Sequence, residues 1–217
     1  MLHKETVSNT TLELIEALQA DNILQGFLLV GDTALSLQIG HRISIDINFF
    51  TQDDFDTREL LEYLEQTYSF QLQYMHKNTL KGIIGGVFVD LLRHNYKLID
   101  NPLTIENIKM ASIKDIAAMK LNAVAGNGTR VKDFIDIYFL LKKHSFSELI
   151  GFYCTKYESR NDFHIIKSLT YFNDIIVEDW PNMYLEKNLT IGEIQKFILE
   201  KRDEFLNEKL NPASNKP

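Results

Sequence analysis

The chain has 217 residues, of which 45% are hydrophobic and 24% are charged, and its formal net charge is −7. This composition is typical of a globular protein with a hydrophobic core, and no apolar run approaches the roughly 20 residues that cross a bilayer. The acidic balance argues against broad, nonspecific binding of nucleic acids.

A single cysteine, Cys154, excludes an internal disulfide and a cysteine cluster around zinc. The first residues are polar and lack the apolar segment of a signal peptide. We therefore expect a cytoplasmic protein with no membrane partner. Residues 211–217 hold no large apolar side chain, and we expect them to be disordered.

The first half of the chain alternates helical and strand patterns. A helix is expected after Ser8, which offers an N-cap, and a short helix opens at Thr33 and stops at Gly40. A third helix is expected over 53–68. We expect strands at 27–30, 43–48, 70–75 and 83–92, the last interrupted by Gly85-Gly86 as a turn or bulge.

The second half is predicted to be helical. Apolar residues recur at helical spacing over 113–124, and Gly126-Asn127-Gly128 breaks that helix. Further helices are expected over 131–143, 162–176 and 191–210. We therefore predict an α+β fold in which an α/β domain at 1–104, a mixed sheet with flanking helices, is followed by a helical domain at 105–217 that completes a cleft.

The strand at 43–48 carries a polar pair. Because side chains alternate along a strand, Asp46 and Asn48 point to one face while Ile45 and Ile47 point into the core. Two oxygen ligands at this spacing suit Mg²⁺, which prefers hard oxygen ligands and shares them with substrate phosphates. Taken alone, the same alternation is more typical of a half-exposed sheet that faces solvent.

A glycine turn precedes this strand. Gly31 allows a ligand to approach the backbone, and the helix that opens at Thr33 offers free N–H groups and a hydroxyl to phosphate. The alternative is a capped turn with Asp32 as the N-cap, and Asp32 places a negative charge where phosphate would approach.

Three further ionisable residues stand in apolar surroundings. Asp90 ends the apolar run Val87-Phe88-Val89, where it could deprotonate an attacking hydroxyl, complete a metal shell or merely cap a turn. Lys120 lies on the apolar stripe of its helix, and Asp136 lies in a helix that is apolar nearly all round. A structural salt bridge between the two helices, such as Lys120 to Asp136, is the alternative to a catalytic role.

Basic residues gather in the middle of the chain. Residues 109–143 hold seven basic and three acidic side chains, whereas the segments on either side are acidic. This stretch is either the place where phosphates are contacted or a solvated helical surface.

These motifs together resemble the opening motif of the AbiEii/AbiGii-type nucleotidyltransferase toxins. The family pattern is roughly G-G-T-A-L-x-L, a short gap, and G-H-R-x-S-x-D-x-D-x-F, which matches residues 31–37 and 40–50. The stretches 114–120 and 130–138 also resemble that family. The resemblance covers about residues 12–143, and residues 144–217 resemble no family that we can name.

The resemblance implies a DNA-polymerase-β-like nucleotidyltransferase fold that uses Mg²⁺ or Mn²⁺ to move a nucleoside monophosphate from an NTP to an acceptor hydroxyl, for which it suggests an RNA end. The acceptor oxygen would attack the α-phosphorus and pyrophosphate would leave. The metal set carried over is Asp46, Asn48 and Asp90. The catalytic set is Asp46, Asp90, Lys120 and Asp136. The nucleotide-binding set is Gly31, Asp32, Thr33, Arg42, Ser44 and Asp133.

The sequence departs from the family pattern at two positions within this site. Asp32 replaces the second glycine, and Asn48 replaces the second carboxylate of the metal pair. A neutral ligand leaves less charge to hold a dication, so either departure can cost orders of magnitude in rate. Three readings stay open: an active toxin-type transferase, an impaired one that binds nucleotide or a partner, and an interaction protein with an antitoxin-like partner.

Overall fold

The computed structural model describes residues 1–210, and the expectation for residues 211–217 lies outside this range. The chain divides into two compact units, one from Met1 to Ile116 and the other from Ala117 onward. None of the helices within the described residues combines the length and the hydropathy needed to span a bilayer.

The first unit is built on a mixed sheet, which in the described residues has the strand order β3-β4-β5-β2-β1-β7-β6. Its strands are β1 (Leu28–Val30), β2 (Ile47–Thr51), β3 (Gln71–His76), β4 (Thr79–Ile84), β5 (Val87–Arg93), β6 (Leu103–Ile105) and β7 (Ile108–Met110). The central β2 pairs antiparallel with β1 and parallel with β5. The predicted α+β class with a mixed sheet is confirmed.

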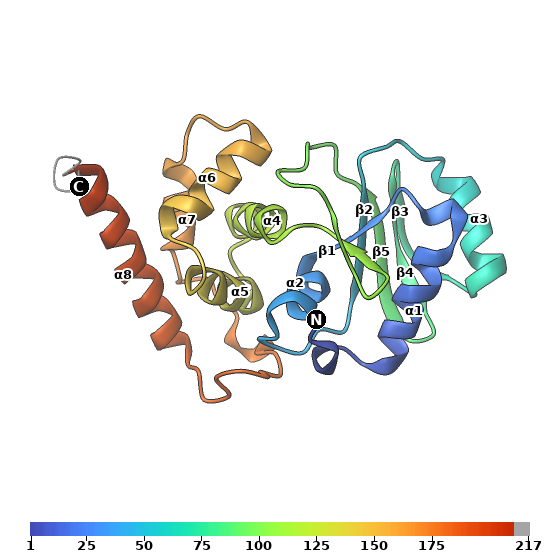
Figure 1. The fold of residues 1–217 in the computed structure, drawn as a ribbon, viewed down its shortest axis with the longest axis horizontal. Coiled ribbons are helices and arrows are strands. Elements are labelled where there is room, and N and C mark those ends of the chain that lie inside the picture. Colours follow the sequence, from blue (N-terminus) through green and yellow to red (C-terminus); the bar gives the residue numbers. More distant parts are fainter. Residues whose placement is uncertain (211–217) are drawn as a thin grey trace. The chain divides into compact units, whose positions relative to one another are not determined.

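Three helices accompany the sheet: α1 (Asn9–Ala20), α2 (Gly31–Ile39) and α3 (Thr57–Tyr68). Figure 1 shows α1 and α3 on the same side of the sheet. Leu64 of α3, Leu80 of β4 and Val89 of β5 are fully buried. The N-caps are Ser8 for α1 and Asp56 for α3, each accepting hydrogen bonds from the first turn. Gly40 ends α2 in a left-handed conformation, as expected of a C-terminal glycine.

Several boundaries differ from the sequence-based expectation. The strand predicted at 43–48 begins only at Ile47, and Ile45 is 67% exposed rather than in the core. The reason is local: the hydroxyl of Thr33 donates to the Asp46 carbonyl, and Ser44 forms an isolated bridge with Val7, so this segment is held by side-chain and single-bridge contacts instead of a strand ladder. Of the turn and the bulge predicted at Gly85-Gly86, the turn is confirmed: the two glycines, both with positive φ angles, join β4 to β5 in a hairpin, and β4 begins earlier than predicted, at Thr79.

The second unit is helical. It comprises α4 (Ile113–Gly126) from Ala117 onward, α5 (Val131–Leu141), α6 (Phe146–Tyr157), α7 (Phe163–Leu169), the short η3 (Val177–Asp179) and α8 (Ile191–Leu210). Helix α5 is buried on nearly every side, and Ile194, Ile198 and Phe205 are the buried residues of α8. The helix expected over 162–176 ends at Leu169, and α6, which begins at a capping box of Ser145 and Glu148, was not predicted.

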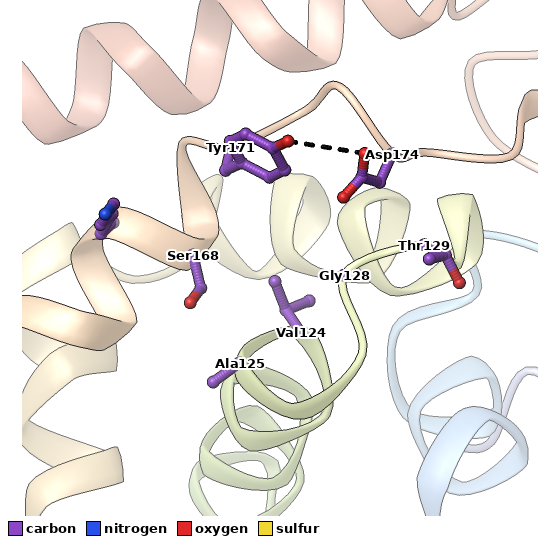
Figure 2. A pocket seen from close by; sticks show the side chains of 8 residues that line it. Val124, Ala125, Gly128, Thr129, Ser168, Tyr171 and Asp174 are labelled. Carbon is purple, nitrogen blue, oxygen red and sulfur yellow. Dashed lines mark hydrogen bonds between the residues drawn. The ribbon is translucent and has the colours of Figure 1, made fainter.

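A pocket of about 370 Å³ lies within the helical unit, lined by the end of α4, the loop after it and the α7 region. Figure 2 shows Tyr171 and Asp174 facing each other at its rim, with the tyrosine hydroxyl 3.5 Å from the aspartate oxygen Oδ1. None of the predicted site residues lines this pocket.

Candidate active site

The sheet brings the predicted metal residues of β2 and β5 together. In the parallel pairing of these strands, Asn48 is the register partner of Asp90, so the two side chains stand side by side on one face. Asp46 lies two residues before Asn48, just ahead of the strand. All three are partly exposed, so a ligand can reach them.

The glycine turn adjoins the same residues. Gly31 follows β1 with a φ of +68°, and a Cβ built there would lie 3.2 Å from the Asn48 side-chain nitrogen. Since L side chains rarely adopt this φ, glycine is required both by the backbone and by the neighbouring asparagine. Asn48 therefore lies between the glycine turn and Asp90.

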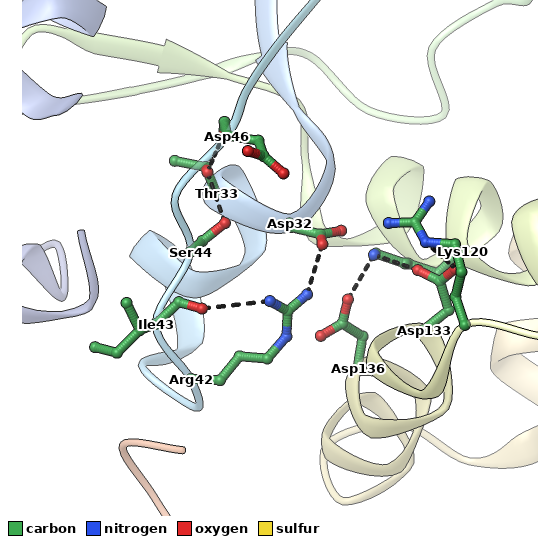
Figure 3. Close-up of polar contacts among 10 residues, drawn as sticks. Asp32, Thr33, Arg42, Ile43, Ser44, Asp46, Lys120, Asp133 and Asp136 are labelled. Atoms are coloured by element: carbon green, nitrogen blue, oxygen red, sulfur yellow. Dashed lines mark hydrogen bonds and ion pairs between the residues drawn. The ribbon is translucent and has the colours of Figure 1, made fainter. Parts of the chain in front are cut away.

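Thr33 and Ser44 hold the segment that carries Asp46. Thr33 is fully buried, its hydroxyl oxygen lies 2.8 Å from that of Ser44, and it donates a hydrogen bond to the Asp46 carbonyl (Figure 3). These contacts fix the backbone at Asp46 relative to the start of α2. The phosphate contacts assigned to both hydroxyls by the family resemblance stay predictions.

Asp32 and Arg42 form a buried ion pair. An Arg42 terminal nitrogen lies 2.8 Å from Asp32 Oδ2, and the two side chains are 2% and 10% exposed. A second Arg42 nitrogen donates to the Ile43 carbonyl over 3.4 Å. The negative charge that replaces the family's second glycine is therefore matched by a guanidinium from the same unit.

A lysine that the sequence analysis did not single out accompanies Asp90. Lys81 is the register partner of Asp90 in the antiparallel β4–β5 ladder, and its Nζ lies 2.6 Å from Asp90 Oδ2. The signal that could have found it is the Gly85-Gly86 turn, since a two-residue hairpin loop fixes which residues face each other.

In the helical unit, Lys120 of α4 pairs with two carboxylates of α5. Its Nζ lies 2.7 Å from Asp133 Oδ1 and 2.5 Å from Asp136 Oδ2, and all three side chains are at most 6% exposed (Figure 3). The salt bridge from Lys120 to Asp136, which the sequence analysis left open as an alternative, is present. Among residues 1–210, Asp133 Oδ2 has no hydrogen-bond partner, and it lies 3.5 Å from Arg130 Nε.

Ion pairs also account for other basic residues in the stretch 109–143. Lys114 lies 2.9 Å from Asp100, and Lys142 pairs with Glu186. Asp100 and Glu186 lie outside the stretch and offset two of its four excess positive charges, whereas Lys120 and Arg130 pair with carboxylates of the stretch itself. The expectation that this stretch contacts phosphates stays a prediction.

Comparison with solved structures defines the class of protein. The chain has a nucleotidyltransferase-type fold. It is similar to a Helicobacter pylori structure described as a candidate nucleotidyltransferase, with a TM-score of 0.53 and 18% identity over 97% of this chain and 95% of that one. It is also similar to JHP933 of the same organism, with a TM-score of 0.50 and 18% identity over 96% and 100% of the two chains.

The family follows from sequence. Residues 83–214 match the family described as nucleotidyl transferase AbiEii toxin, type IV TA system, and the chain belongs to this family. An uncharacterized protein of Aquifex aeolicus is 33% identical over 202 residues, which cover 89% of this chain and 95% of that protein. The match includes residues 144–214, so the expectation that the chain after 143 lies outside the family resemblance was wrong.

Proposed function

We propose that this protein is a Mg²⁺-dependent nucleotidyltransferase, able to use Mn²⁺ as well, that moves a nucleoside monophosphate from an NTP to the hydroxyl of an RNA end. The proposal includes a toxin role with an antitoxin-like protein partner, in keeping with the family. The observation that carries it is the side-by-side register of Asn48 and Asp90 next to the Gly31 turn.

The residues at this position fit a divalent cation. Asp46, Asn48 and Asp90 offer two carboxylates and one amide oxygen, which are the hard oxygen ligands that Mg²⁺ takes in proteins. Their partial exposure leaves room for phosphate oxygens to complete a coordination shell. A bound cation would neutralise charge on the transferring phosphoryl group.

The chain's own residues would carry the remaining chemistry. The Asp90 carboxylate would accept the proton of the acceptor hydroxyl as the new bond to the α-phosphorus forms and the bond to the β-phosphate oxygen breaks. Pyrophosphate would leave with the electron pair of that bond. The backbone around Gly31 would receive the phosphates at the start of α2, where the N–H groups of the first turn have no helical acceptor.

The residues of the helical unit enter the proposal through the family resemblance. We assign Lys120 and Asp136 to catalysis and Asp133 to nucleotide binding. Each is bound in an ion pair within its own unit. The nucleotide-binding assignments of Asp32, Thr33, Arg42 and Ser44 belong to the same proposal.

The test is nucleotide transfer by the full chain. Purified protein is incubated with Mg²⁺, total RNA and each of the four labelled NTPs, and label is followed on denaturing gels. We expect labelled RNA with at least one NTP, and a loss of roughly a hundredfold or more in Asp46→Asn and Asp90→Asn. Asp203→Asn, an exposed aspartate on α8, is the matched control. Absence of transfer with all four NTPs would contradict the proposal.

A second candidate function is nucleotide binding without turnover. Asn48 supplies no charge, and Lys81 already neutralises one of the two remaining carboxylates. Thermal shift with each NTP and Mg²⁺ separates the two functions. Stabilisation without transfer to RNA or to protein favours the binding module, whereas transfer excludes it.

A further inference from the structure

The sheet face that carries Asp90 continues across β4 and β3. Alternation along β5 places Phe88 on the same face as Asp90, and the antiparallel ladder sets Lys81 opposite Asp90 and Ile83 opposite Phe88. Strand β3 extends this row, since Tyr74 is the register partner of Lys81. We call the surface of Phe88, Ile83, Lys81 and Tyr74 the aromatic face.

A β-bulge places Tyr74 on this surface. The register between β3 and β4 shifts between Leu72 and Tyr74, so the pairing passes over Gln73. If the register of Gln71 and Leu72 continued unshifted, Gln73 would lie opposite Lys81 and Tyr74 opposite the buried Leu80. Bulges are over-represented next to active sites because they redirect a side chain in this way.

The aromatic face is open to solvent. Phe88 is 53% exposed on β5, in which it alternates with buried residues, and Tyr74 is 52% exposed on β3, all of whose residues are exposed. The Lys81 side chain is 43% exposed, and its ammonium has donors left beyond the one used on Asp90. A complex that buries the half-exposed Phe88 would be stabilised, because apolar surface would be removed from water.

We propose that the aromatic face binds the terminal nucleoside of a single-stranded RNA acceptor, with its base stacked on Phe88 and its phosphodiester toward Lys81 and Tyr74. This inference rests on the proposed function, because it assigns the acceptor to the same carboxylates. Phe88 lies two residues, about 7 Å, along the strand from Asp90. A base is joined to the reacting hydroxyl through a single sugar ring, so a hydroxyl at Asp90 brings its base near Phe88.

Nucleic acid fits this surface better than an apolar partner. Aromatic side chains on an open sheet are a recurrent platform for unpaired bases, and stacking is tolerant of sequence because every base has a π-face. Lys81 supplies the cation that a phosphodiester needs within the same row.

Equilibrium binding in the absence of NTP tests the proposal. The probe is a short fluorescein-labelled single-stranded RNA of mixed sequence with a free 3′ hydroxyl, titrated with the full chain at low salt. We expect Phe88→Ala to weaken binding about tenfold and Phe88→Trp to retain it. Phe163→Ala removes a phenylalanine of α7 that is 69% exposed, more than Phe88, and should change nothing. Equal affinities for the Phe88→Ala and Phe163→Ala variants, or no binding by the wild type, would overturn the proposal.

Photo-crosslinking locates the base directly. An RNA with 4-thiouridine at its 3′ end is irradiated with the protein, and the modified peptide is mapped by mass spectrometry. A crosslink on the β5 peptide supports the aromatic face, whereas one on the peptide of Tyr171, at the helical pocket, contradicts it. Transfer with unchanged dependence on RNA concentration in Phe88→Ala would leave the proposed function intact and remove this inference. RNA binding that depends on Phe88, without any nucleotide transfer, would support this inference and contradict the proposed function.

Discussion

Asn48 is a neutral residue at a position where the family pattern has a carboxylate. It occupies the middle of a row that runs from the Gly31 turn to Asp90, so its amide lies where the family pattern has a carboxylate. We propose Asn48 as a metal ligand, although its amide contributes no charge toward a cation. At this position, the effect of a ligand's charge can therefore be tested without changing where the ligand lies.

Asn48→Asp should raise metal affinity and transfer activity together. The added carboxylate keeps the position of the amide and contributes a full negative charge toward a dication. We expect at least about tenfold tighter Mn²⁺ binding by electron paramagnetic resonance, with a parallel rise in transfer. Asn207→Asp adds the same charge on exposed α8 and should alter neither quantity. Unchanged Mn²⁺ affinity would mean that Asn48 is not a ligand.

Lys120 is predicted to be essential for stability, whatever its part in catalysis. Lys120→Met leaves Asp133 and Asp136 buried without the ammonium that they share, and breaking a buried pair in this way costs about 3–5 kcal/mol. Thermal unfolding should show a large fall in Tm. Lys196→Met, which removes an exposed pair with Glu200 at 3.9 Å, should cost less than about 1 kcal/mol. Similar Tm values for the two variants would contradict this account.

The sequence predicted some residues of the site and missed others, and the difference has a physical reason. Asp46, Asn48 and Gly31 are close in the chain, so a motif reveals them. Lys81 becomes a neighbour of Asp90 only through the strand register of β4 and β5, which the Gly85-Gly86 hairpin turn sets. Lys81 was not predicted, because that register follows only once the two glycines are interpreted as the turn of a hairpin.

The bounds of helices and strands were predicted well where the hydrophobic periodicity is strong. They were predicted poorly where a single contact determines the local conformation. The extent of α8 and the glycine stop of α2 follow the pattern closely. The segment before β2 alternates like a strand, yet the Thr33 hydroxyl and the single bridge to Val7 hold it in another conformation. The short strands β6 and β7 were missed because three-residue strands have too few residues to show a period.

Asp21 links two elements and makes their association dependent on pH. It follows α1 and accepts hydrogen bonds from the hydroxyls of Tyr63 and Tyr68 on α3, over 2.6 and 2.7 Å. Burial raises the pKa of Asp21, but these hydroxyls and the Ile23 amide outweigh it, so the pKa is lowered. Since the folded-state pKa lies below the unfolded value of about 4, the stabilisation is complete above that pH and is lost as pH falls through the folded-state pKa.

Asp21→Asn should therefore destabilise the protein at neutral pH and much less in acid. We expect a cost of about 1 kcal/mol at neutral pH, seen as a lower Tm, that shrinks below about pH 4. Tm measured across this range for wild type, Asp21→Asn and the surface control Asp203→Asn gives the difference directly. A difference that stays constant from neutral pH to about pH 3 would exclude the charge of Asp21 as its origin.

At the scale of the whole molecule, the bounds of the sequence match differ from the bounds of the two compact units. The Aquifex aeolicus relative is similar over 202 residues that include parts of both units, so the two occur together in that protein as well. The family match begins at residue 83, within β4, and crosses the division between the units. A family boundary is therefore no guide to where an independently folding part ends.

The chain from 1 to 116 should fold alone, whereas the chain from 1 to 104 should not. Strand β7 lies beyond residue 104 and pairs in parallel with β1, with Ile108 and Met110 fully buried and the Ala111 amide bonded to the Leu29 carbonyl over 3.0 Å. The fully buried Asp115 accepts hydrogen bonds from the Ser112 hydroxyl and from the backbone amides of residues 99 and 100.

Truncation at 104, the domain boundary predicted from sequence, removes these apolar side chains from the core and leaves β1 without one of its partners. We expect cooperative thermal unfolding by circular dichroism for the 1–116 fragment and none for the 1–104 fragment. Cooperative unfolding of the shorter fragment would place the boundary at 104, and would mean that β7 adds little to the stability of the sheet that holds Asn48 and Asp90.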